Sequence, residues 1–327
     1  MEKLATETKM YHLANTDLDV SRLSYGTWHL GGTWDKNPLT EDLVDRADKL
    51  INTAFELGIN HIDMADIYTM GKSDEVVGRV LKKNPGLRDK LVLQGKAGII
   101  LANQPNEGDP GRYDFSYDHI VSTVEGTLKR LGTDRLDLLA LHRPDPLVEP
   151  EEIARALDHL YNSGKVRYFG VSNHNWAQIE LLKKYVKQPL VLNQVELNLK
   201  HHHLISNGFL FNTGENDHTG AIGTLDYCRL HDITIQAWSP VAGGDLFKTD
   251  RGCARVKETI ESLAKKHDTT SEAIAVSWLL RHPAGIQPII GTLNEDRLKA
   301  TAKADSVELS RKEWYQLLED ARGTKVP

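Results

Sequence analysis

Short apolar runs alternate with amphipathic segments along the whole of this 327-residue chain. Several runs are almost free of polar residues, as parallel strands covered on both faces are. The segments between them carry apolar residues at a spacing of about 3.6, the period of an α-helix. Eight strands are expected, at residues 20–26, 61–64, 91–96, 136–142, 166–171, 190–195, 233–238 and 286–290. This α/β alternation without a linker predicts a single (β/α)8 TIM barrel over residues 1–327.

A doubly wound sheet is the structural alternative for such an alternation. That fold usually carries Gly-x-Gly-x-x-Gly after its first strand, and this sequence has no such motif. Gly71, Lys72 and Ser73 resemble the end of a phosphate-binding loop. The earlier glycine that such a loop requires falls on Asp66, however, so this interpretation fails.

Three stretches are longer than a minimal barrel needs, at residues 27–39, 198–219 and 239–253. Each follows a strand and so belongs to the C-terminal face, where barrel enzymes place their active sites. Loops of this length in a compact domain are usually functional or mobile. We expect 198–219 and 239–253 to be loop insertions over the barrel mouth, and 310–320 to be a last helix outside the barrel.

The composition excludes several classes of partner. The net charge is −6, and no run of lysine and arginine is long enough to attract nucleic acid or an acidic membrane. Residues 1–9 lack the apolar region of a signal peptide, and no segment is long enough to span a bilayer. The cysteines, Cys228 and Cys253, form no disulfide framework and fit a reducing compartment. We therefore expect a soluble, cytoplasmic protein.

Polar side chains stand at the ends of three consecutive expected strands. Asp63 ends the second strand, with Tyr68 in the loop after it. Lys96 ends the third strand and His142 ends the fourth. A lysine within an apolar strand is costly unless it is paired, and Asp63 on the neighbouring strand is its natural partner. A lysine against the Tyr68 oxygen would lower the pKa of the phenol, which for free tyrosine is about 10.

Each of these residues has an ordinary interpretation when taken alone. An aspartate at a strand end is more often a cap, and a lone tyrosine usually packs with its hydroxyl satisfied. Together, at one face of successive strands, the residues favour catalysis. Tyr68 is then the proton donor to a substrate oxygen, and His142 could donate to the same oxygen and orient it. Lys96 and Asp63 tune the phenol.

These residues and their spacing resemble those of the aldo-keto reductase family. The family signature Gly-x-x-x-x-Asp-x-Ala-x-x-Tyr stands here as Gly58, Asp63, Ala65 and Tyr68. The positions that match the family's catalytic tetrad are Asp63, Tyr68, Lys96 and His142.

The resemblance extends over nearly the full length of the chain. Residues 137–145 resemble the family's fourth strand, and residues 164–173 resemble its fifth almost residue for residue. The sequences His-Arg-Pro-Asp-Pro at 142–146 and Pro-Ile-Ile-Gly-Thr at 288–292 are similar to those of a bacterial-type, NADP-dependent oxidoreductase subset of the family.

The resemblance implies a nicotinamide cofactor extended across the barrel mouth. In the family pattern, Ser172, Asn173 and Gln194 hold the nicotinamide carboxamide. Trp238 stands where the family stacks an aromatic ring, commonly tyrosine, on the nicotinamide. Small residues after Trp238 would let backbone amides approach the pyrophosphate. The remaining implied cofactor contacts are Gly26, Thr27, Trp28, Asp63, Ser239, Pro240, Val241, Gly243, Gly291, Thr292 and Arg297.

NADP(H) is the expected cofactor, and NAD(H) stays open. Arg297 suits a bidentate contact with the adenosine 2′-phosphate, although a solvated helix charge is its ordinary interpretation. The family often has a lysine at the position of Gly291 and an asparagine at the position of Thr301. This chain departs from the pattern at both positions.

The first long loop supplies aromatic residues for a substrate pocket. Ordinary loop packing is the alternative for Trp28 and Trp34. Arg143, just past the expected catalytic histidine, reaches either a substrate carboxylate or a nearby acid, Asp145 or Glu149. The expected pocket residues are Trp28, His29, Trp34, Tyr68 and His142.

The run Lys200-His201-His202-His203 invites a metal-binding interpretation. Three consecutive histidines cannot all face one ion from a strand, and no cysteine or glutamate spacing supports a site. We expect a solvated loop and no metal.

Reduction of aldehyde or ketone carbonyls to alcohols by hydride transfer is therefore the expected function, with a small-molecule substrate. A barrel enzyme of another chemistry, such as a phosphate-binding isomerase, fits the motifs poorly. A second class of function stays open, a cofactor-binding regulatory subunit of a larger complex with little turnover, because such relatives can keep the tetrad.

Overall fold

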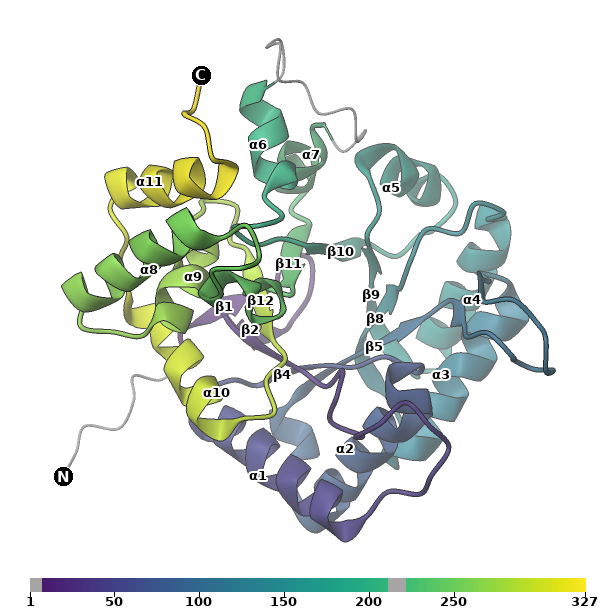
Figure 1. The fold of residues 1–327 in the computed structure, drawn as a ribbon. Helices are drawn as coiled ribbons and strands as arrows, with labels where there is room; N and C mark the ends of the chain where they lie inside the picture. The colour runs from purple at the N-terminus through teal and green to yellow at the C-terminus, as the bar shows by residue number, and fades with distance from the viewer. Residues whose placement is uncertain (1–7, 211–221) are drawn as a thin grey trace.

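A closed barrel of parallel strands forms the centre of the molecule (Figure 1). The structure is a computed structural model that describes residues 8–210 and 222–327. Its strands follow the order β10-β11-β12-β3-β4-β5-β8-β9 around the barrel. This confirms the expected fold class. The barrel strands are β3 Ser24–Gly26, β4 His61–Asp63, β5 Val92–Ala97, β8 Leu136–Leu141, β9 Val166–Ser172, β10 Leu190–Glu196, β11 Thr234–Trp238 and β12 Gln287–Ile290.

The expected strand at 20–26 is divided in the structure. Its first part belongs to an antiparallel hairpin, in which β1 (Met10–His12) pairs with β2 (Asp19–Ser21). Its second part is β3, which pairs with β4 and β12 in the barrel. The backbone bends between the two parts, where the Arg22 amide donates to the carbonyl of Lys9 at 2.8 Å. One apolar run thus serves two sheets, which its composition alone does not reveal.

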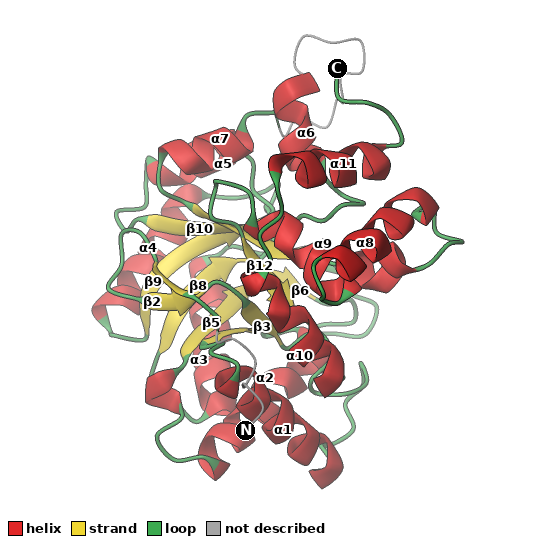
Figure 2. Cartoon of the chain, turned by 90° about the vertical axis from the view of Figure 1, so that its left-hand side faces the viewer, coloured by secondary structure: helices red, strands yellow, loops and turns green. Residues whose placement is uncertain are grey.

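Helices surround the barrel and cover the outer faces of its strands (Figures 1 and 2). Interior and exterior faces are both buried, which explains the continuous apolar runs. The α-helices are α1 Glu41–Glu56, α2 Lys72–Lys83, α3 Tyr117–Leu131, α4 Pro150–Asn162, α5 Trp176–Lys183, α6 His203–Leu210, α7 Thr224–Leu230, α8 Ala254–Lys266, α9 Ser271–Leu280, α10 Glu295–Ala302 and α11 Arg311–Arg322.

Local signals set the helix ends. The Thr40 side chain caps α1 by accepting a hydrogen bond from the Leu43 amide, and Gly58 follows the helix with φ +80°. Ser310 and Glu313 form a reciprocal capping box at the start of α11, which lies outside the barrel as expected. Short elements complete the chain. They are β6 Ile99–Ile100, β7 Arg112–Tyr113, and the 3-10 helices η1 Tyr68–Gly71, η2 Arg88–Lys90, η3 Ala242–Phe247 and η4 Lys303–Ser306.

The long segments after strands are only partly irregular. Residues 27–39 contain no helix or strand. The segment 239–253 includes η3, and the segment 198–219, expected as a loop, contains α6. Residues 211–219 of that segment lie outside the described residues. Helix α6 is short and carries apolar side chains, such as Ile205, that pack on the core. The polar composition of the rest of the segment conceals this helix.

Within residues 8–210 and 222–327, none of the helices has both the length and the apolar character that crossing a membrane would need.

Candidate active site

Lys96, on β5, lies at the centre of a buried polar cluster at the barrel mouth. Its side-chain ammonium contacts the Asp63 carboxylate at 2.7 and 2.8 Å and the Met64 carbonyl at 3.0 Å. The third group is the Tyr68 hydroxyl, also at 3.0 Å. An ammonium carries three protons, and these three partners use all of them. The Tyr68 oxygen therefore accepts from Lys96, and its own proton is left to donate elsewhere.

The barrel register brings these residues together. Asp63 at the end of β4 lies beside Gln94 of β5, and Lys96 follows Gln94 on the same face of the strand. Tyr68 comes from η1, whose start is shaped by Thr69 and Met70 with φ +48° and +63°. Left-handed backbone at non-glycine residues is unfavourable and typically marks functional sites. The loop thus holds the Tyr68 hydroxyl over the end of β5.

In this cluster, burial and the charge of the neighbouring group shift the pKa values of Lys96 and Tyr68 in opposite directions. Burial alone would lower the pKa of Lys96, but the Asp63 carboxylate outweighs it, and the pKa of Lys96 is raised. Burial raises the pKa of Tyr68, and the Lys96 charge only partly offsets this rise. The phenol is therefore less acidic than free tyrosine, contrary to the expectation that lysine would make it more acidic. The contribution of Lys96 has the expected direction, but the sequence does not reveal how deeply the phenol is buried.

His142 follows β8 directly and faces the same phenol. Its ring lies 5.9 Å from the Tyr68 ring, centroid to centroid, in an edge-on arrangement. The His142 amide donates to the Ala97 carbonyl at 2.9 Å, which holds the residue at the strand end. Burial, followed by the Lys96 charge, lowers the pKa of His142 well below its usual value. The imidazole is therefore neutral at neutral pH and offers one N–H donor.

Aromatic residues of segment 27–39 lie against the cluster. The Trp28 ring packs on the Tyr68 ring at 4.8 Å and on the Trp34 ring at 5.0 Å, with His29 edge-on at 5.9 Å. Trp28 and Trp34 remain 42% and 39% exposed. A large, half-exposed aromatic surface thus adjoins the phenol.

Trp238, at the end of β11, forms a second half-exposed surface at the mouth. Its indole N–H donates to the Asn173 side-chain oxygen at 3.1 Å. The Asn173 amide nitrogen in turn donates to the His142 carbonyl at 3.2 Å and to Ser172 Oγ at 2.8 Å. Arg143 lies over the Trp238 ring at 5.7 Å. Asn173 therefore links the expected stacking surface to the histidine of the tetrad.

Gln194, Gly26 and Thr27, which are all expected to contact the cofactor, lie deep in the site. Gln194 is 2% exposed, and its amide nitrogen donates to Asp63 Oδ1 at 2.8 Å rather than facing the mouth. Thr27 is buried, and its hydroxyl donates to the Asp63 carbonyl at 3.1 Å. Gly26 is also enclosed, since a Cβ there would lie 2.8 Å from Ile289 Cγ2. These residues line the floor of the site.

The remaining expected cofactor residues lie along β11, β12 and α10. Ser239, Gly243 and Gly244 have φ of +52°, +62° and +88°, so backbone amides after Trp238 turn sharply. Pro240 is buried and Val241 half-buried beside them. Gly291 has open space where a Cβ would stand. Thr292 follows it, and Arg297 is exposed in the first turn of α10. A half-exposed ring, a turned backbone, an open glycine and an exposed guanidinium fit the parts of an extended dinucleotide.

Four glutamines inside the barrel were not singled out together by sequence reasoning. Gln194 was assigned only through the resemblance, and the other three were given no role. Each interrupts an apolar strand, which is a signal that could have found them, because buried amides need partners. They are Gln94, Gln194, Gln236 and Gln287.

The histidine run lies apart from the tetrad. His202 is 8% exposed and its ring nitrogen lies 3.1 Å from Ser206 Oγ, at the start of α6. His201 and His203 pack edge-on at 5.3 Å. Among the described residues, no three histidine, cysteine or acidic side chains form a metal-binding group. Cys228 and Cys253 are both buried thiols.

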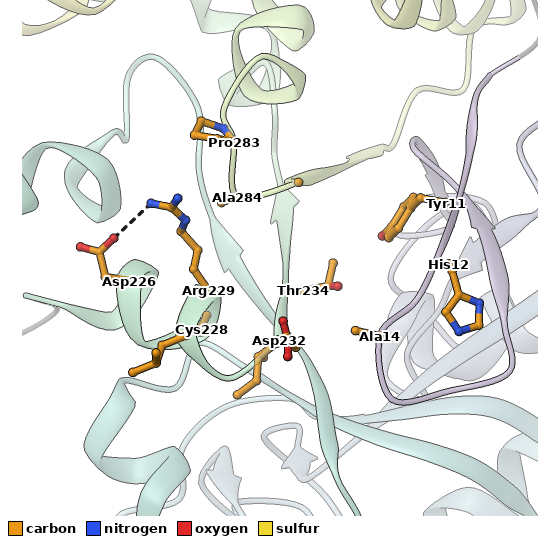
Figure 3. A pocket seen from close by; sticks show the side chains of 13 residues that line it. Tyr11, His12, Ala14, Asp226, Cys228, Arg229, Asp232, Thr234, Pro283 and Ala284 are labelled. Carbon is orange, nitrogen blue, oxygen red and sulfur yellow. Dashed lines mark hydrogen bonds and ion pairs between the residues drawn. The ribbon is translucent and has the colours of Figure 1, made fainter.

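A cavity of about 630 Å³ opens at the opposite end of the barrel (Figure 3). Its lining comes from the β1 hairpin and from residues just before β11 and β12, such as Asp232 and Ala284. Arg229 on its wall is paired with Asp226 at 3.4 Å, as the dashed line shows. The tetrad lies at the C-terminal ends of the strands, so this cavity is separate from it.

The fold and the site define a class of protein, a (β/α)8 barrel with a buried carboxylate–lysine–phenol cluster at its C-terminal mouth. Comparison with known proteins agrees. The sequence profile of the Aldo/keto reductase family matches residues 22–319. The chain belongs to the aldo/keto reductase family, and the resemblance found in its sequence is confirmed. It is therefore an oxidoreductase, and this family uses nicotinamide cofactors.

Several relatives are similar along nearly their whole length. The 6-dehydroglucose reductase of Agrobacterium fabrum is 35% identical, over 97% of this chain and 100% of that protein. Oxidoreductase YdhF of Escherichia coli is 34% identical, over 94% of this chain and 96% of that protein. The crystal structure of a thermostable aldo-keto reductase in complex with the inhibitor epalrestat has a TM-score of 0.76 and 26% identity, covering 95% of this chain and 99% of that one.

Proposed function

We propose that this chain reduces aldehyde or ketone carbonyls to alcohols with a reduced nicotinamide cofactor. The observation that carries the proposal is the contact of Lys96 with both Asp63 and the Tyr68 hydroxyl, the latter at 3.0 Å. That contact leaves one phenolic proton free to be donated toward the mouth. The same arrangement accepts a proton in the reverse reaction, so it serves alcohol oxidation as well.

The cofactor's place follows from the residues that fit its parts. Ser172, Asn173 and Trp238 would hold the nicotinamide, with Gln194 beneath them on Asp63. Residues 239–244 and 291–292 would follow the pyrophosphate and adenosine. When bound, the cofactor supplies the hydride that reduces the carbonyl carbon. The exposed guanidinium of Arg297 favours NADP(H), because a 2′-phosphate gives it a bidentate partner.

Different side chains have different roles at the carbonyl oxygen. Tyr68 donates its proton to the oxygen as negative charge develops there. Neutral His142 donates an N–H hydrogen bond to the same oxygen and fixes its position. The Lys96 charge stabilises the phenolate that remains, and Asp63 holds Lys96 in place.

The half-exposed rings of Trp28 and Trp34 would form one wall of the substrate pocket, with His29 beside them. Indole faces pack well on the apolar face of a sugar ring as well as on aromatic substrates. Two relatives are named 6-dehydroglucose reductases. This supports 6-dehydroglucose, a sugar that carries an aldehyde, as the first substrate to be tested.

The replacement Tyr68→Phe tests the proposal. We expect kcat for the reduction of 6-dehydroglucose or of an aldehyde panel to fall on the order of 10²–10⁴-fold, because the general acid is removed while the ring is kept. Consumption of NADPH and of NADH, followed by absorbance, measures it. Tyr161→Phe is the matched control, since Tyr161 is 52% exposed on α4 and its variant should keep full activity.

Two outcomes would contradict the proposal. Unimpaired kcat in Tyr68→Phe would remove the phenol from the mechanism. A wild-type protein that binds NADPH tightly but reduces none of the carbonyls would instead fit a cofactor-binding regulatory subunit.

A further inference from the structure

A layer of buried amides crosses the barrel interior below the tetrad. Asp63 of β4 lies in register with Gln94 of β5. On the far side, Gln236 of β11 lies in register with Gln194 of β10 and with Gln287 of β12. All five side chains belong to residues that are 3% exposed or less. The interior of such barrels is ordinarily filled by branched apolar side chains, so a polar layer here needs a reason.

The amides converge on one carboxylate oxygen. Asp63 Oδ1 accepts from Gln94 Nε2 at 2.9 Å and from Gln194 Nε2 at 2.8 Å, in addition to Lys96 at 2.7 Å. The other oxygen, Oδ2, accepts from Lys96 at 2.8 Å. Two neutral amides thus share the charge of the same carboxylate that holds the lysine.

The hydrogen-bond network ends at the Asp63 carboxylate on one side and at the Ser21 carbonyl on the other, and these two acceptors determine how each amide is oriented. Gln236 Oε1 accepts from Gln94 and Gln194 at 2.9 and 3.0 Å. Gln236 Nε2 donates to Gln287 Oε1 at 2.8 Å, and Gln287 donates to the Ser21 carbonyl at 2.7 Å. The carboxylate and the carbonyl can only accept, so each amide has one orientation that satisfies its neighbours.

We propose that Gln94 and Gln194 are positioning residues that hold the Asp63 carboxylate, share its charge, and so set how Lys96 acts on Tyr68. This rests on the function proposed above. Neither amide touches the phenol, so each acts through Asp63. A carboxylate with three donors on one oxygen cannot rotate without losing them, and Lys96 stays with it. The amides also weaken the negative potential that Asp63 exerts on the phenol.

The charged and titratable groups around the phenol come from four places. Lys96 approaches it from β5 and Asp63 from β4, Asp66 lies in its own loop, and His142 follows β8. His61, two residues before Asp63 on β4, is buried, and burial lowers its pKa to about 4, so it is neutral near neutral pH. Asp63 raises the pKa of Tyr68 and Lys96 lowers it. Loss of an amide that bonds Asp63 should therefore raise the pKa of the phenol further, because the negative potential of Asp63 is then less weakened.

The test replaces Gln94 by methionine, which keeps the volume and removes the donor. The reductive reaction needs a protonated phenol, so kcat/KM falls as pH rises through the pKa of Tyr68. We expect Gln94→Met to move this basic limb upward by at least about half a unit, because a charge-assisted hydrogen bond to Asp63 is lost. We also expect kcat to fall about tenfold or less, since the phenol is a weaker acid.

Gln287→Met is the matched control. Gln287 is 1% exposed, against 0% for Gln94, and belongs to the same amide layer, but it bonds Gln236 and the Ser21 carbonyl and not Asp63. Its replacement should lower Tm to a similar degree and leave the basic limb where it is. A second readout avoids turnover. Absorbance titration of tyrosinate, wild type minus Tyr68→Phe, gives the phenol's pKa in the protein alone, and it should rise in the Gln94→Met background.

The outcomes separate this proposal from the proposed function. If Gln94→Met lowers Tm like the control and neither the basic limb nor the tyrosinate titration moves, the amides are purely structural and the proposal is overturned. If Gln94→Met does not fold, Gln94→Asn serves, because its amide is one methylene too short to reach Asp63, and the same shift is expected. A wild-type protein without turnover would contradict the proposed function. The tyrosinate titration would still decide the role of Gln94, because it needs no turnover.

Discussion

Asp66, two residues before Tyr68, shows how a single carboxyl group responds to burial. Its Oδ1 atom is buried and without a hydrogen-bond partner among the described residues. Burial, reinforced by the nearby Asp74, raises the pKa of Asp66 from 3.8 to about 7. The folded protein therefore holds a proton on Asp66 that the unfolded chain releases near pH 4. The contribution of Asp66 to the free energy of unfolding therefore falls as the pH rises from about 4 to about 7.

Replacing this carboxyl by an amide should remove the pH dependence. Relative to wild type, Asp66→Asn should gain about 1–2 kcal/mol of unfolding free energy between about pH 5 and pH 8, because asparagine has no proton to lose. Urea unfolding of both proteins at the two pH values measures the difference. Asp74 is kept in both proteins, and its partner Arg130 lies 2.9 Å away. Parallel stabilities at the two pH values would show that Asp66 is ionised in the folded protein across this range.

At the residue scale, the sequence predicted which groups form the site but not their protonation. Asp63, Lys96 and His142 were identified from their positions at strand ends, and Tyr68 from the loop after the second strand. The higher pKa of the phenol and the neutral state of His142 arise from burial, and burial depends on residues such as Trp28 that pack above them. A sequence pattern contains the type of each residue and not its solvent exposure.

Helices α2 and α3 pack with an unusually close backbone approach at Gly78. A Cβ at this position would lie 2.3 Å from the Arg130 carbonyl oxygen and 2.9 Å from Leu131 Cα. Both are backbone atoms, so no side-chain rotation relieves the clash. The two helices would have to move apart, and α2 directly follows the loop that carries Tyr68.

We expect Gly78→Ala to lower the free energy of unfolding by about 1–3 kcal/mol, although alanine is the better helix former. Gly208→Ala is the matched control, since Gly208 lies within α6 and has open space at the Cβ position. That variant should be neutral or more stable by up to about 1 kcal/mol. Equal effects of the two replacements in thermal unfolding would mean that helix propensity, and not packing, determines both.

Element boundaries were the part of the fold best predicted from local patterns. Strands β5, β8 and β9 begin and end within one residue of the expected positions. The exceptions are informative. The run 20–26 divides between two sheets, and α6 lies within a segment expected as a loop. In both cases the outcome depends on a tertiary partner, the hairpin strand β1 or the core, that no local pattern contains.

On the scale of the whole molecule, Arg22 joins the start of the barrel to its end. Its guanidinium contacts Asp305 at 2.8 Å and the Leu280 carbonyl at 2.7 Å. The pairing of β3 with β12 closes the ring of strands nearby. The Asp305 side chain is 3% exposed. A buried carboxylate that loses its cation is strongly destabilising.

Arg22→Met should therefore lower the free energy of unfolding by about 2 kcal/mol, less than for a fully buried pair because the Arg22 side chain is 27% exposed. Arg155→Met is the control, because that side chain is 63% exposed and its pair with Glu152 contributes well under about 1 kcal/mol. Urea unfolding compares them. The double variant Arg22→Met/Asp305→Asn should recover part of the loss, and no recovery would mean that Asp305 is not the source of the cost.

The sequence by itself determined the class of fold and the order of its elements, and it predicted the tetrad. These depend on local periods of apolar residues and on residue types at strand ends, which neighbouring residues specify. Only the tertiary structure decided which side chains meet. Closure of the barrel brings Gln194 of β10 across to Asp63 of β4, and Gln236 of β11 across to Gln94 of β5. Contacts across a closed ring join residues far apart in the chain, so the charge on Asp63, and through Lys96 the acidity of Tyr68, depends on the whole barrel.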